Sequence, residues 1–63
     1  MKMLRLHEVV RRVTLSRATI YRMMHLGRFP KPMRIGLRTK AWIEEEVDAW
    51  FRERDKERNV TKD

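Results

Sequence analysis

Hydroxyl, guanidinium and phenol groups gather in the segment 16–22, at a spacing suited to one exposed side of a helix. Arginine can donate two hydrogen bonds to guanine O6 and N7 in the major groove of DNA. Hydroxyl groups at the start of a helix can cap it or bind phosphate oxygens. The candidate DNA contacts of this segment are Ser16, Arg17, Thr19, Tyr21 and Arg22.

Each of these candidates has an alternative interpretation. Arg22 either reads a guanine or clamps a phosphate, and Arg17 contacts a phosphate or a base edge near the rim of the groove. Helix capping and helix packing chiefly explain Ser16 and Thr19, with phosphate contact as an addition. Tyr21 either packs on the sugar–phosphate backbone or is a partly buried amphipathic side chain.

A second cationic group follows Gly27. Arg28 is a candidate phosphate contact, and Gly36-Leu37-Arg38 predicts the tight turn of a β-hairpin over about 33–42. Alternation along this hairpin predicts a two-stranded wing with one apolar and one cationic face. Its apolar positions are Met33, Ile35 and Ala41, and its basic positions are Arg34, Arg38 and Lys40. We expect the basic positions to contact the minor groove or adjoining phosphates, the alternative being a solvated charge run.

Apolar residues at helical spacing predict the elements that position these groups. A first helix begins at His7 or Glu8 and ends near 13–14, after a short apolar entry at 3–6 that forms a β-bridge or an extended arm. The recognition helix spans about 16–26: Ser16 caps it, and Gly27 and the prolines after it end it. Its core face is formed by Ile20, Met23 and Met24, opposite Ala18, Tyr21, Arg22 and His25.

A third helix begins with the acidic residues 44–46, where the helix dipole favours negative charge. Its apolar stripe is Ile43, Val47, Trp50 and Phe51. Phe29, Trp42 and Trp50 are predicted core residues. Residues 1–58 therefore form a single domain, and 59–63 form a frayed C-terminal tail.

Composition excludes several classes of protein. The chain has 63 residues and no cysteine, and its two histidines are too few for a convincing metal site. No metal, other cofactor or small-molecule substrate is expected, and nothing resembles a catalytic constellation, so the protein is not expected to be an enzyme. Neither a signal peptide nor a membrane span is apparent, which predicts a cytoplasmic protein of the bacterial nucleoid.

Charge is distributed unevenly along the chain. Residues 1–42 contain eleven lysines and arginines against one acid, Glu8, whereas residues 43–63 contain five against eight acids. A basic front on a small domain predicts a polyanion-binding surface.

Four segments together resemble the AlpA family of phage regulatory proteins: LRLHEV (4–9), LSRATIYR (15–22), GRFPKP (27–32) and WIEEEVDAW (42–50). The resemblance implies a mainly α fold with a small β-hairpin, a compact winged helix-turn-helix similar to excisionases and MerR-type regulators. Leu37 departs from the smaller or polar residues common in the family at the hairpin tip. The implied function is sequence-specific binding of double-stranded DNA to regulate transcription in a prophage or integrated element.

Two other functions stay open on the sequence. The first is an excisionase, or recombination directionality factor, that bends attachment-site DNA beside integrase. The second is a protein-interaction module, although the chain shows no uninterrupted apolar run that would form a large patch. A second copy of the chain, as a dimer or a cooperative array, and an integrase are the candidate protein partners.

Overall fold

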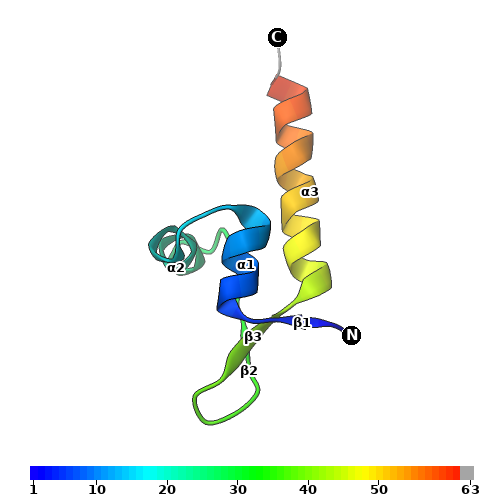
Figure 1. Ribbon diagram of the computed structural model, residues 1–63. Coiled ribbons are helices and arrows are strands. Elements are labelled where there is room, and N and C mark those ends of the chain that lie inside the picture. The colour runs from blue at the N-terminus through cyan, green and yellow to red at the C-terminus, as the bar shows by residue number, and fades with distance from the viewer. Residues whose placement is uncertain (62–63) are drawn as a thin grey trace.

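The structure, a computed structural model, describes the backbone of residues 1–61 and the side chains of residues 1–57. The elements in chain order are β1 (Met3–Leu4), α1 (Leu6–Val13), α2 (Arg17–His25), β2 (Met33–Arg34), β3 (Lys40–Ile43) and α3 (Glu44–Thr61) (Figure 1). Three helices and a small antiparallel sheet form a mainly α domain of the winged helix-turn-helix type. This confirms the predicted fold class.

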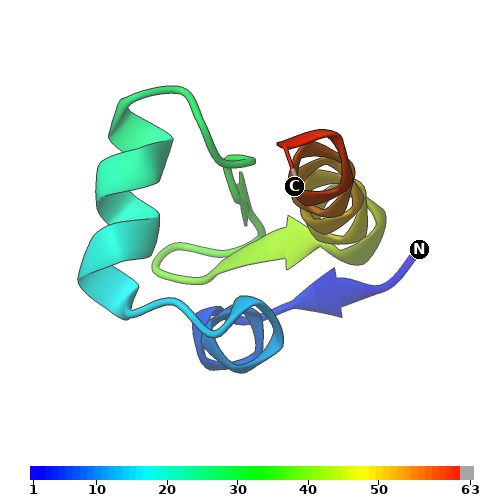
Figure 2. The same ribbon diagram turned by 90° about the horizontal axis from the view of Figure 1, so that it is seen from above.

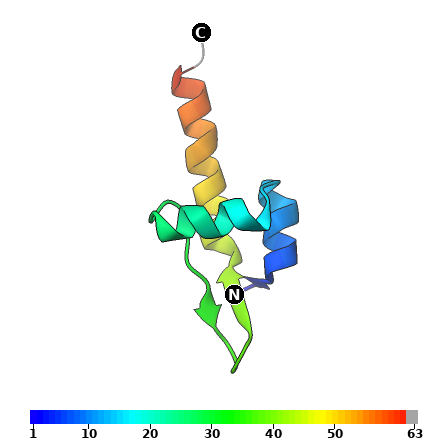
Figure 3. The same cartoon turned by 90° about the vertical axis from the view of Figure 1, so that its left-hand side faces the viewer.

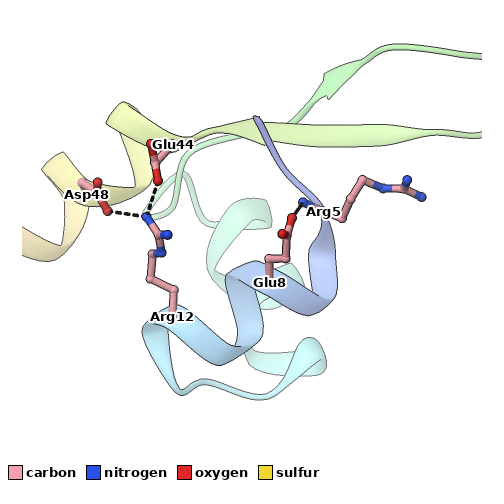
Figure 4. Close-up of polar contacts among 5 residues, drawn as sticks. All are labelled: Arg5, Glu8, Arg12, Glu44 and Asp48. Carbon is pink, nitrogen blue, oxygen red and sulfur yellow. Dashed lines mark hydrogen bonds and ion pairs between the residues drawn. The ribbon is translucent and has the colours of Figure 1, made fainter. Parts of the chain in front are cut away.

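Helix α1 starts at Leu6, one residue before the predicted start. The start is fixed by Glu8, whose carboxylate accepts a hydrogen bond of 2.8 Å from the backbone N–H of Arg5 (Figure 4). This contact satisfies a backbone donor at the helix start, where no intrahelical partner exists. Val9 and Val13 of α1 are buried, as their spacing predicts.

The Glu8 contact makes the stability of the protein depend on pH. The hydrogen bond from Arg5 holds the pKa of Glu8 below its ordinary value of 4.5. A carboxyl group whose pKa is lowered by folding stabilises the folded state above its ordinary pKa, and this stabilisation is lost as pH falls through the folded value. We therefore expect Glu8→Gln to lower the free energy of unfolding at neutral pH.

The difference between Glu8→Gln and the wild type should shrink as urea unfolding is measured from about pH 7 down to about pH 3. A difference that stays constant with pH would show that the carboxylate charge makes no contribution.

The turn between α1 and α2 contains a strained residue. Thr14 caps α1 with φ 57°, in the left-handed region that β-branched side chains disfavour. Helix α2 ends in the more usual way, with Gly27 at φ 74°. The N–H groups of Gly27 and Arg28 donate to the carbonyls of Met24 and Met23, at 3.0 and 2.8 Å, which is the Schellman pattern.

These two positions should respond oppositely to substitution. Thr14→Gly should raise the free energy of unfolding by about 0.5–1 kcal/mol, because relief of the left-handed strain exceeds the entropic cost of glycine. Gly27→Ala should lower it by about 1 kcal/mol, and the cost is conformational since an added Cβ would meet no atom within 4 Å. Thermal and urea unfolding measure both, and a destabilising Thr14→Gly would contradict the strain.

Strand β3 lies in the middle of the sheet, whose order is β1-β3-β2. The predicted hairpin is present, with Met33 opposite Ala41 and Arg34 opposite Lys40. Of the two alternatives for residues 3–6, the β-bridge is confirmed, because β1 adds a third strand by pairing Leu4 with Trp42.

The predicted apolar face of the hairpin is covered only in part. Ala41 is fully buried, but Met33 and Ile35 are 47% and 53% exposed. The physical reason is the position of the hairpin, which extends beyond the helices, so that no element covers its outer half (Figure 1).

Buried apolar side chains from every part of the domain form one core around Trp42. Its members are Leu4, Val9, Val13, Ile20, Phe29, Trp42 and Val47. The indole Nε1 of Trp42 donates to the carbonyl of Pro30 at 2.9 Å. This bond ties β3 to the segment that follows α2. The burial of Trp42 and Phe29 confirms both as core residues.

Only the first part of α3 joins the core. Trp50 is half-buried and packs edge-on against Phe29, with ring centroids 4.8 Å apart. Phe51 belongs to the predicted apolar stripe of α3, but it is 50% exposed because the helix runs on past the rest of the fold (Figure 3). The backbone is helical through Thr61, and residues 62–63 lie outside the described residues, so the frayed tail at 59–63 stays a prediction.

One arginine joins α1 to the start of α3. Arg12 Nη1 lies 3.0 Å from a Glu44 oxygen and 3.1 Å from an Asp48 oxygen (Figure 4). Hydrogen bonding to Glu44, and then to Asp48, raises the pKa of the Arg12 guanidinium above its ordinary value. Two acids at the start of α3 are thereby neutralised within the fold.

Candidate nucleic-acid interface

Three separate parts of the chain form an open groove of about 420 Å³. They are the start of α1, the first turns of α2 and the wing, by which we mean the hairpin residues 33–42. The groove is lined by Arg5, Leu6, His7, Arg17, Tyr21, Arg38, Lys40 and Trp42. Four of the nine predicted site residues meet here, two from α2 and two from the wing.

The groove also contains two residues that the sequence analysis did not single out, Arg5 and His7. Their types suit phosphate binding, but they stand in or next to the segment 3–6, which the sequence predicts as an apolar entry to the first helix. They reach the groove because β1 pairs with β3, which fixes the start of α1 beside the wing. The one local signal was the pair of polar residues flanking Leu6.

A second groove shares Tyr21 and Lys40 with the first. It is lined by Tyr21, Met24, His25, Lys31 and Lys40. Lys31 was also missed, although it stands between two prolines in a run without acids, and both features favour an exposed cation. The two grooves, which we call together the cationic depression, share Tyr21 and Lys40 and contain lysines or arginines from the start of α1, α2, the wing and the segment before the wing.

The outer face of α2 borders this depression. Ile20 is fully buried, while the residues predicted to lie opposite it are all exposed: Ala18, Tyr21, Arg22 and His25. Figure 3 shows α2 lying across the face of the molecule with the wing below it, and Figure 2 shows the connection between β2 and β3 on the same side of the molecule as α2. A straight, convex helix and a projecting hairpin thus share one side of the protein.

Ser16 and Thr19 form hydrogen bonds with each other. The Ser16 hydroxyl accepts a hydrogen bond of 3.1 Å from the Thr19 backbone N–H, and it donates one of 2.9 Å to Thr19 Oγ1. Ser16 is therefore the helix cap that its sequence position predicts. A contact of either hydroxyl with phosphate stays a prediction.

The remaining predicted residues lie apart from the groove. Arg22 is exposed on the outer face of α2, and Arg34 is exposed on the edge strand β2. Arg28 lines a different groove with Trp50, Glu53, Arg54 and Glu57 of α3. Its carbonyl accepts a hydrogen bond of 2.8 Å from Trp50 Nε1, which fixes the backbone of Arg28 against α3.

No acidic residue close in sequence balances the positive charge of α2 and the wing. Residues 14–43, which contain α2 and the wing, have seven lysines and arginines and no acid. The acids that flank this run are occupied elsewhere, since Glu8 caps α1 and Glu44 pairs with Arg12. Such a surface attracts a polyanion from solution.

The described part of the chain contains neither a candidate metal site nor a helix suited to a membrane. Among the described side chains, those of residues 1–57, there is no group of three or more histidine or acidic side chains placed to hold a metal ion. Nor does any described helix have the length and apolar character required to cross a membrane.

Comparison with known proteins identifies the family. A family model described as the prophage CP4-57 regulatory protein AlpA matches residues 2–55, which is most of the chain. The chain belongs to the AlpA family. The matched residues include α1, α2, the wing and the part of α3 that packs on the core.

Two relatives extend this comparison. The AlpA protein of Escherichia coli strain K12, a DNA-binding transcriptional activator, is 34% identical over 61 residues, covering 87% of each chain. The uncharacterized protein ORF88 of Enterobacteria phage P4 is 40% identical over 50 residues, or 79% of this AlpA-family chain. The chain spans 57% of the length of that phage protein.

Proposed function

We propose that this AlpA-family protein is a sequence-specific regulator that binds double-stranded DNA of a prophage or integrated element in the bacterial nucleoid. In this proposal α2 enters the major groove, and the wing contacts the sugar–phosphate backbone or the minor groove. The observation that carries it is the cationic groove in which Arg17 and Tyr21 of α2 face Arg38 and Lys40 of the wing.

The shape of this surface suits duplex DNA. A major groove about 12 Å wide admits one α-helix, and the exposed face of α2 presents side chains that can reach base edges. Arg17 and Arg38 lie where phosphates would flank the helix, and Arg5 and His7 extend the same cationic surface. A relative in Escherichia coli described as a DNA-binding transcriptional activator supports the same function for this chain.

Electrostatics should dominate the affinity. Each lysine or arginine that neutralises a phosphate releases counterions, so binding weakens steeply as salt is raised. A single small module buries little DNA surface, so useful specificity requires repeated sites, self-association or a partner such as integrase.

The deciding experiment is a footprint on DNA surrounding the protein's own gene and the adjacent integrase gene or attachment site. Random competitor DNA and a salt series are included. A discrete protected site that survives the competitor is the expected result. Weak binding that salt abolishes, with no protected site, would contradict a sequence-specific regulator that acts on its own.

The same DNA tests the alternative role in recombination. An excision factor would protect sites within the attachment region and stimulate excision by integrase in a reconstituted reaction. A transcriptional regulator would instead protect a promoter and alter its transcription.

A further inference from the structure

We propose that Leu37, at the tip of the wing, inserts between base pairs from the minor groove and kinks the bound DNA. This inference rests on the proposed DNA binding and adds the form of DNA that the protein binds, a bent duplex. It assigns a role to a residue that neither packing nor charge explains.

Leu37 is the most exposed of the large apolar residues after the N-terminal methionine. Its exposed fraction is 93%, and it lies in the connection between β2 and β3. Ile35 and Met33 on the same hairpin are 53% and 47% exposed. We call these three exposed side chains the apolar ridge of the wing, and Leu37 is its most exposed member.

Cations surround this ridge. Arg34, Arg38 and Lys40 flank Leu37 along the hairpin, and no acid occurs between residues 9 and 43. An apolar tip among cations matches a partner with an anionic surface and an apolar interior. Duplex DNA is such a partner, because its phosphates lie outside and its stacked bases lie within.

The position of the tip fits this partner as well. Figure 2 shows the β2–β3 connection on the same side as α2, and in Figure 1 it points away from the projecting half of α3. With α2 in a major groove, the hairpin would meet the adjacent minor groove. Proteins that insert an apolar side chain there unstack one base step and kink the duplex.

The hairpin is held firmly enough to act as a wedge. Ile35 N–H donates to the Thr39 carbonyl at 2.9 Å across the base of the turn. Below it, β3 pairs on both edges, and Ala41 and Trp42 are buried in the core. The tip is thus mounted on the central strand of the sheet.

Bending can be measured by energy transfer between dyes at the two ends of a duplex of about 30 base pairs. The duplex carries the protected site, or mixed sequence if no site is protected. We expect the wild-type protein to bend this DNA by about 20–90°, the range of minor-groove wedges. Leu37→Ala should still bind but leave the DNA close to straight, whereas Leu37→Met should retain the bend.

Phe51→Ala is the matched control, because Phe51 is an exposed apolar residue on α3, away from the wing. It should bend DNA as the wild type does. A second measurement uses the same duplex with a two-base mismatch placed beneath the wing. The wild type should bind the mismatched duplex about tenfold more tightly than the matched duplex, because the mismatched bases are already unstacked. Leu37→Ala should bind the two duplexes with equal affinity.

The outcomes separate this inference from the proposed function. Straight DNA in the wild-type complex, or equal bending by Leu37→Ala, would overturn the wedge and leave DNA binding intact. Absence of DNA binding would overturn both. If Leu37→Ala only abolishes self-association on DNA, the ridge contacts a second copy of the chain and the wedge is wrong.

Discussion

Trp42→Ala should remove at least about a third of the free energy of unfolding of this protein. The Trp42 side chain is 1% exposed at the centre of the core, and its removal opens a large cavity. Replacing a buried tryptophan by alanine costs about 3–5 kcal/mol. At about 0.05–0.15 kcal/mol per residue, a domain of 63 residues has about 3–9 kcal/mol of stability in total.

The hydrogen bond from Trp42 Nε1 to the Pro30 carbonyl makes a second contribution to the free energy of unfolding, and a separate variant can measure it. Trp42→Phe keeps most of the apolar volume and loses the bond, so it should cost less than alanine, about 1–3 kcal/mol. Both variants should also release the wing from the segment after α2, because this bond joins the two.

Thermal and urea unfolding followed by circular dichroism measure these losses. Phe51→Ala serves as the control, since its side chain is half exposed and its effect should stay within about 1 kcal/mol. A shift in Tm of only a few degrees for Trp42→Ala would contradict the central role of this residue, because 1 kcal/mol corresponds to about 4–8 °C in so small a domain.

Arg22→Ala should weaken binding to the protected site more than binding to random DNA. Arg22 is exposed on the outer face of α2, where a guanidinium can form two hydrogen bonds with guanine. A good bidentate contact contributes about 1–3 kcal/mol of discrimination, or roughly 5- to 150-fold in the ratio of the two affinities.

Arg17→Ala provides the contrasting variant. Arg17 lines the groove with Arg38 and Lys40, a position suited to phosphate, so its loss should reduce both affinities equally. It should also lower the slope of log affinity against log salt by about 1. Arg11→Ala, an exposed position on α1, controls for the loss of one positive charge.

Competition binding with specific and random duplexes measures the ratio for all three variants, after circular dichroism has shown that each is folded. Equal losses on both duplexes for Arg22→Ala would make Arg22 a phosphate clamp, and the base-reading residue would have to be sought elsewhere on the outer face of α2.

The sequence by itself determined the parts of this protein that short-range chemistry controls. Ser16 as a helix cap, the end of α2 at Gly27 and the burial of Ile20 each follow from residues within one or two helical turns. The hairpin and the core positions of Phe29 and Trp42 were also predictable, because turn chemistry and large apolar side chains leave few alternatives.

Only the tertiary structure decided which of the cationic residues share a surface. The pairing of β1 with β3 brings Arg5 and His7 into the groove, while packing of Trp50 holds the backbone of Arg28 against α3. The exposure of Met33 and Ile35 has a similar origin, since alternation along a strand gives its two faces but not whether another element covers them. These features depend on contacts between residues far apart in the chain, and no local pattern encodes such contacts.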